Sequence, residues 1–113
     1  MSSASDLRLV LITHPRRGAR LFARRLVEQR LAACVNLVAA DSLFLWRGAL
    51  DSAREQLLIV KTRAAHLSAL ERHLRAEHPY DTPELVALDP VHVAPRYLAW
   101  LRPELPQRAA RRR

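Results

Sequence analysis

The sequence has little cysteine, little glycine and few aromatic residues. Its single cysteine, Cys34, excludes an internal disulfide framework and a zinc site built from several thiolates. Two glycines and an apolar content of 50% exclude a collagen-like or low-complexity chain. Apolar runs such as 9–12 and 57–60 are far shorter than the roughly 20 residues that cross a bilayer. The N-terminal residues lack the basic start and apolar stretch of a signal peptide, so we expect a cytoplasmic protein without a membrane partner.

The charge is strongly basic, with a formal net charge of +8 over 113 residues. Such a charge first suggests nucleic acid as the partner. Half of it, however, comes from the four arginines of segment 108–113, and most of the remainder comes from an arginine cluster within residues 16–30. Aromatic residues make up only 5% of the chain, and no RNA-binding signature is present. We therefore expect no specific nucleic-acid partner.

Hydrophobic spacing predicts four elements in the first half of the chain. A strand is expected over 7–13, and a helix is expected from Ala19 to a point between Leu31 and Ala33. Residues 34–38 and 43–46 form one long or interrupted strand with a bulge at 39–42. A turn at Arg47-Gly48 then leads to a hairpin partner strand over 52–62.

The second half of the chain repeats the helix and strand pattern. Leucines at helical spacing predict a helix over 64–77, which Pro79 terminates. A core strand over 84–88 and a short closing helix over 95–101 follow. The resulting order predicts an α+β fold, a ferredoxin-like βαββαβ sandwich with a short C-terminal helix. We expect a flexible N-terminus over 1–6, one domain over 7–102 and a basic tail over 103–113.

The predicted sheet is apolar on both faces. Leu9 and Leu11 project to one face and Val10 and Ile12 to the other, because successive strand residues point to opposite sides. Two helices cover only one face of such a sheet. With no second domain in 113 residues, the simplest cover for the other face is another copy of this chain in a closed symmetric assembly.

Segment 77–84 combines a helix end, a rigid turn and a strand start. Pro79 and Pro83 restrict the backbone and hold the side chains beside them with little freedom. Glu77 and His78 would supply a carboxylate and an imidazole, which suit copper(II), zinc or nickel. The alternative is that both residues decorate a helix terminus while Tyr80 packs.

This segment and several others resemble the CutA divalent-ion tolerance family. The similarity covers roughly residues 7 to 102, and its motifs occur in the order found in that family; they are 31–34, 42–48, 60–62, 78–84 and 97–101. The resemblance implies a ferredoxin-like fold, a compact homotrimer and tolerance of copper or other divalent cations in the cytoplasm.

Some members of that family bind copper through a cysteine at the end of the first strand and a His-His pair at the end of the second helix. Ile12 stands at the cysteine position here, and Glu77-His78 replaces the His-His pair. Loss of the thiolate should remove affinity for Cu(I) first, because soft ligands select that ion. We expect a weak site at Glu77 and His78 for Cu(II) or another divalent cation, with no cofactor required.

A second hypothesis is a PII-like small-molecule sensor with ligand clefts between subunits. The only lysine, Lys61, would bind an anion, and Trp46 and Tyr80 would wall the cleft together with Glu84. Interface packing is the alternative role for these aromatic residues. The sequence contains no glycine-rich phosphate loop, nucleophile elbow or acid pair beside a base, so we expect no enzyme.

Overall fold

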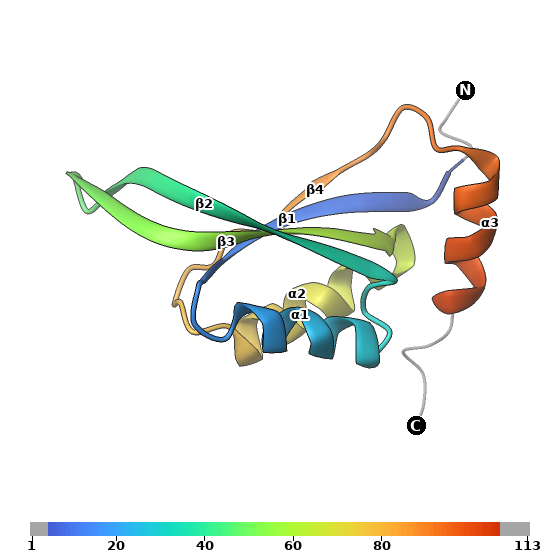
Figure 1. The fold of residues 1–113 in the computed structure, drawn as a ribbon, viewed down its shortest axis with the longest axis horizontal. Coiled ribbons are helices and arrows are strands. Elements are labelled where there is room, and N and C mark those ends of the chain that lie inside the picture. The colour runs from blue at the N-terminus through green and yellow to red at the C-terminus, as the bar shows by residue number, and fades with distance from the viewer. Residues whose placement is uncertain (1–4, 107–113) are drawn as a thin grey trace.

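A sheet layer and a helix layer make up the body of the protein (Figure 1), and the structure, a computed structural model, describes residues 5–106. The strands are β1 (Leu7–Pro15), β2 (Cys34–Trp46), β3 (Ala49–Arg63) and β4 (Val86–Leu88). The helices are α1 (Ala19–Glu28), α2 (Leu67–Glu77) and α3 (Pro95–Glu104), and a single 3-10 turn, η1 (Ala64–His66), precedes α2. The strand order β2-β3-β1-β4, with every pair antiparallel, confirms the predicted α+β ferredoxin-like fold.

The core lies between the sheet and helices α1 and α2. Val10 and Ile12 of β1 alternate with the residues that face away, and both are fully buried. They pack with Leu58 and Val60 of β3 and with apolar side chains of the two helices, namely Phe22, Leu26, Leu70 and Leu74. This is the helix-covered face that the strand alternation predicts.

The opposite face of the sheet, which we call the open face, is covered only at one end. Helix α3 packs there through Leu101 and Leu105, which contact Leu7 and Leu9. Further along the sheet, Val86 and Leu88 of β4 are 46% and 44% exposed. An exposed apolar face of this kind marks an interaction surface rather than a finished core.

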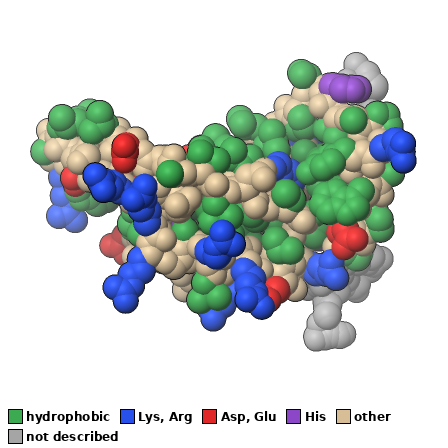
Figure 2. Space-filling view, in the orientation of Figure 1, with side chains coloured by type: hydrophobic (Ala, Val, Ile, Leu, Met, Phe, Trp, Pro, Cys, Tyr) green, Lys and Arg blue, Asp and Glu red, His purple; other side chains and the backbone are tan. Residues whose placement is uncertain are grey.

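Strands β2 and β3 form a long hairpin whose outer end, residues 43–50, extends beyond the helices; we call it the arm (Figure 1). Arg47 and Gly48 both have positive φ angles, as a two-residue type I′ turn requires. Leu43, Leu45 and Leu50 are about three-quarters exposed. Figure 2 shows apolar side chains gathered on the projecting tip.

The predicted bulge at 39–42 is wrong. Residues 39 to 42 pair one-to-one with residues 56 to 53, so β2 runs without interruption from Cys34 to Trp46. The small side chains in this segment leave β2 free to follow β3, which begins at Ala49 rather than Ser52. A continuous ribbon is stiffer than an interrupted one and carries the arm clear of the body.

Several other boundaries differ from the prediction, including the end of β1 at Pro15 rather than Thr13 and the start of α2 at Leu67 rather than Ala64. Helix α1 ends at Glu28, because Arg30 adopts a left-handed φ of 60° and the N–H groups of Leu31 and Ala32 both turn back to Leu26 O. Strand β4 begins at Val86, after the constrained Pro83 segment. Helix α3 continues to Glu104 and includes Pro103.

The folded body extends past both expected domain boundaries. Asp6 is ion-paired to Arg63, and Leu105 is fully buried, so neither residue belongs to a separate terminal segment. Residues 1–4 of the expected N-terminus and 107–113 of the expected tail lie outside the described part of the chain. Among residues 5–106, no helix is both long and apolar enough to cross a membrane.

Candidate functional site

The Glu77-His78 pair lies where α2 ends. His78 has an extended backbone, with φ −79° and ψ 141°, because Pro79 prevents the helix from continuing. The imidazole of His78 is 8% exposed, whereas Glu77 is exposed. The two candidate ligands therefore occupy different environments although they are adjacent in the sequence.

Both ring nitrogens of His78 have partners within the chain. Nε2 lies 2.8 Å from the carbonyl oxygen of Thr13, which only accepts, so Nε2 carries the proton. The backbone N–H of Tyr80 donates to Nδ1 at 3.0 Å. Burial lowers the pKa of His78 despite the favourable Thr13 contact. The side chain is therefore a neutral imidazole that fixes the turn between α2 and β4.

Other rings surround His78. Its centroid lies 4.8 Å from that of His14, 5.6 Å from that of Phe22 and 5.0 Å from that of Tyr80. His14 is itself buried at the end of β1 and donates from Nδ1 to its neighbour Pro15 O at 2.8 Å. These contacts pack β1, α1 and the residues after α2 into one rigid corner.

Tyr80 joins this corner to β3. Its hydroxyl donates to Glu55 Oε2 at 2.9 Å, and Glu55 is 4% exposed. Burial and the hydrogen bond to the carboxylate raise the pKa of Tyr80 to about 12. The phenol is therefore protonated at neutral pH and serves as the donor that a buried carboxylate requires.

The remaining ligand position holds no donor atom. Ile12, which stands where the family resemblance implies a cysteine ligand, is fully buried in the apolar core. A nearby cavity of about 150 Å³ is lined by His14, His73 and Glu77, but Arg25 also lines it and opposes a cation. Within residues 5–106, no three His, Cys, Asp or Glu side chains are grouped closely enough to hold a metal ion.

Folding stability is expected to fall as the pH is lowered from about 7 to about 5, because burial lowers the pKa of His66 and of His78. In the unfolded chain, both histidines take up protons at an ordinary pKa near 6.5, whereas in the folded chain they stay neutral to a lower pH. Their contribution to folding stability is therefore complete above about pH 6.5 and is lost as the pH falls toward their lowered pKa values in the folded chain. Melting temperature against pH measures it. His66→Gln should flatten the profile, whereas exposed His92→Gln should not; equal profiles for all three proteins would contradict the assignment.

The four residues of the expected cleft do not meet within one chain. Lys61 lies opposite Cys34, where its Nζ donates to Asn36 Oδ1 and lies 3.8 Å from Cys34 Sγ. Trp46 lies at the tip of the arm, twelve residues along the ribbon from Lys61, which corresponds to about 40 Å at the usual rise of a strand. Tyr80 contacts Glu55 of β3, which is six residues, or about 20 Å, from Lys61 along the strand. Glu84 is exposed in the segment that precedes β4. Only a second copy of the chain could bring these residues together.

Two residues of the corner have no counterpart among the sequence-predicted sites. His14 and Glu55 are buried polar residues that contact the 78–84 segment from strands far apart in the sequence. The one available signal for His14 is its place at the end of a strand, beside Pro15. Glu55 stands in a polar stretch with Arg54 and Gln56 and gives no local signal of burial.

Sequence comparison decides the family. A family model described as "CutA1 divalent ion tolerance protein" matches residues 8–104 of this chain. The chain belongs to this CutA1 family. Divalent-ion tolerance is therefore the kind of function to which it is related, and the resemblance drawn from the sequence motifs is confirmed.

Individual CutA relatives are about 40% identical. The divalent-cation tolerance protein CutA of Thermus thermophilus is 45% identical over 96 residues, which are 83% of this chain and 93% of that protein. The chloroplastic CutA of Arabidopsis thaliana is 42% identical over 96 residues, 83% of this chain but 53% of the plant protein. This chain thus spans about half the length of its plant relatives.

Solved CutA structures share the fold. The Thermus thermophilus divalent cation tolerance protein superposes with a TM-score of 0.84 at 42% identity, covering 88% of this chain and 99% of that one. A PII-like protein CutA from Nostoc gives a TM-score of 0.84 at 27% identity, with 88% and 98% covered. The agreement extends over nearly the whole described body.

Proposed function

We propose that this CutA chain forms a cytoplasmic homotrimer that contributes to divalent-cation tolerance, binds copper or another divalent ion weakly and catalyses no reaction. Family membership supports the role in divalent-cation tolerance. A lone, half-buried cysteine suits a reducing compartment. Relatives carry names that place them in the chloroplast or the periplasm, so fractionation of cells that express this chain is the test of location.

The observation that carries the proposal is the arm, which is apolar on both of its faces. Leu43 and Leu45 project to one side, and Phe44 and Trp46 project to the other. In an isologous dimer, each chain uses a single patch, so only one of the two apolar faces of the arm would be covered. In a closed ring of three, each arm has two neighbouring chains, one for each face, and the open faces of the three sheets cover one another.

Weak metal binding follows from the partners of His78. An incoming ion must take the Nδ1 lone pair from the N–H of Tyr80, and the cost of that lost hydrogen bond lowers the affinity. Glu77 is exposed one residue away and would add a carboxylate oxygen. Imidazole and carboxylate without a thiolate favour Cu(II), zinc or nickel over Cu(I).

Calorimetric titration of the full chain with Cu(II) and with zinc tests the site. Wild type should bind with low affinity, and His78→Ala should lose most of that binding because it removes the imidazole ligand. His92→Ala is the matched control, since His92 is exposed and lies outside the corner. Identical isotherms for wild type and His78→Ala would show that His78 is not a ligand.

A PII-like sensor of a small anion is the second candidate function. It requires an assembly, because Lys61, Trp46 and Tyr80 lie far apart within one chain and could share a cleft only between subunits. The solved Nostoc relative carries the description PII-like. If the protein is such a sensor, cation tolerance is an indirect result of signalling. Cells that express His78→Ala would then keep their cation tolerance.

A further inference from the structure

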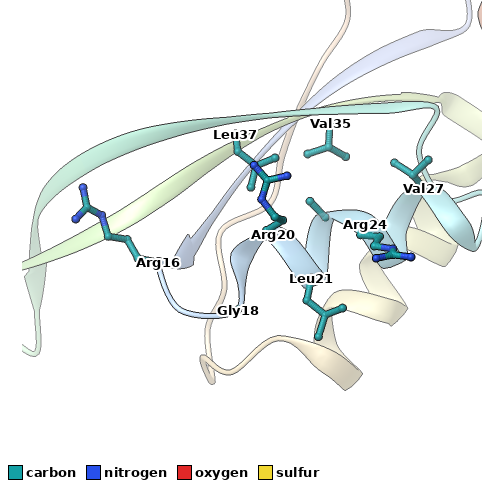
Figure 3. A pocket seen from close by; sticks show the side chains of 9 residues that line it. Arg16, Gly18, Arg20, Leu21, Arg24, Val27, Val35 and Leu37 are labelled. Atoms are coloured by element: carbon teal, nitrogen blue, oxygen red, sulfur yellow. The ribbon is translucent and has the colours of Figure 1, made fainter.

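A groove runs between helix α1 and the edge strand β2, on the helix side of the sheet (Figure 3). Its volume is about 630 Å³, within the range of roughly 300–1,000 Å³ typical of small-molecule sites. Arg16, Arg20 and Arg24 line it together with the apolar side chains Val27, Val35 and Leu37. Figure 3 shows the Arg20 side chain reaching from α1 toward Leu37, with Arg16 at one end of the groove.

Among the described residues, only one of the three arginines that line this groove is paired with a carboxylate. Arg24 donates from Nε to Glu28 Oε2 at 2.8 Å. Neither Arg16 nor Arg20 has a carboxylate within 4.0 Å among residues 5–106, and the first turn of α1 contains no acidic residue. Figure 2 shows basic side chains gathered over this part of the helix layer. Repulsion among these cations is relieved when an anion binds between them.

The apolar side chains give the groove a second character. Val35 and Leu37 pair with Val60 and Leu58, so they lie on the helix face of the sheet, and they remain only half-buried because α1 does not fully cover the edge strand. Val27, on α1, is 37% exposed. An apolar or ring-shaped group placed here would complete the cover of these side chains.

We propose that this groove binds a small molecule with two or more phosphate groups and an apolar or ring-shaped body. Guanidinium groups recognise phosphate through paired N–H donors, and Arg20 and Arg24, four residues apart on α1, are separated by about 6 Å along the axis. The phosphates contact Arg16 and Arg20, and the body lies against Val35 and Leu37. The groove is open to solvent but recessed between α1 and β2, which suits a small ligand better than the plane of a bilayer. The groove is separate from the His78 corner and from the open face, so the proposal does not depend on the metal site or the trimer.

Calorimetry on the full chain with adenosine triphosphate as the probe tests this proposal. Wild type should bind saturably, and Arg20→Gln should weaken binding by about tenfold or more, the usual effect of losing a charge-assisted hydrogen bond. Arg25→Gln is the matched control, because Arg25 is exposed on the same helix but does not line the groove. Its affinity should stay within about twofold of wild type, since the exposed Arg25 side chain lines the cavity on the other side of α1 and donates no hydrogen bond into the groove.

Two further probes separate the sources of the phosphate. Tripolyphosphate has the charge without the ring and should bind several-fold more weakly, and Val35→Thr should weaken adenosine triphosphate binding but not tripolyphosphate binding. Retention on phosphatidylcholine vesicles containing phosphatidylglycerol should be the same for wild type and Arg20→Gln, because the net charge of +8 attracts such vesicles independently of the groove. Four results would overturn the proposal: no saturable binding, equal losses in Arg20→Gln and Arg25→Gln, equal affinity for both soluble probes, or binding to vesicles alone.

Discussion

Replacing Arg63 with alanine should lower the free energy of unfolding by about 2–4 kcal/mol, because it breaks a partly buried ion pair with Asp6 and leaves the carbonyls of Arg102 and Leu105 without their charged donor. Arg63 is 8% exposed, and its Nη2 lies 2.6 Å from Asp6 Oδ2. Its Nη1 donates to Leu105 O at 2.8 Å, so one guanidinium joins β3 to the start of β1 and to the end of α3. Denaturant unfolding at a fixed protomer concentration measures the loss.

The matched control is Arg30→Ala. Arg30 also reaches the end of α3, where its Nη1 lies 2.9 Å from Glu104 Oε1, but both side chains are largely exposed. Exposed pairs contribute about 0–1 kcal/mol, so this variant should unfold close to wild type. Similar losses for the two variants would mean that Arg63 does not act as a buried clamp.

Replacing Leu58 with alanine should cost about 2–5 kcal/mol, because it removes a large side chain from the centre of the core and leaves a cavity. Leu58 is fully buried on β3, opposite Ile12 and Leu37 on the neighbouring strands. Phe22 and Leu26 of α1 and Leu70 of α2 belong to the same cluster. Thermal and denaturant unfolding of the variant should report the same loss if unfolding is two-state.

Leu21→Ala is the same substitution at an exposed position. Leu21 lies on α1 and is 51% exposed, so the expected change is within about 0.5 kcal/mol. A small effect of Leu58→Ala, comparable to that of Leu21→Ala, would contradict the position of the core between the sheet and the helices.

The sheet and its two faces could be predicted because they follow from strand alternation. Val10 and Ile12 lie in the core, and Leu9 and Leu11 lie on the open face, as a two-residue period requires. The turn at Arg47-Gly48 could also be predicted, since glycine tolerates the positive φ of a type I′ hairpin. These features depend on residues close together in the sequence.

Two features could not be predicted, for different reasons. Residues 39–42 read as a bulge in isolation, but pairing with β3 keeps them in a regular ladder, so tertiary pairing outweighs the local pattern there. Apolar spacing predicts that helix α1 continues to Leu31, yet the positive φ of Arg30 ends it after Glu28. This second difference is local, because the N–H groups of Leu31 and Ala32 turn back to Leu26 O, and no glycine or proline in the sequence signals it.

The candidate site shows the same limit. Pro79 and the end of α2 at Glu77 could be predicted, so the place of His78 could be too. The contact of its Nε2 with Thr13, 65 residues away in the sequence, could not. That contact converts an expected metal ligand into a buried imidazole whose two nitrogens are both in use, and it explains why we propose only weak binding at this position.

Sedimentation of the full chain at micromolar concentration tests most directly whether the open face and the arm are covered by other copies. A single species of about 39 kDa, three times the chain mass of 12.9 kDa, is the predicted result. Leu45→Asp, which places a charge on the exposed tip of the arm, should shift the population toward smaller species. A wild-type species near 12.9 kDa would contradict the assembly.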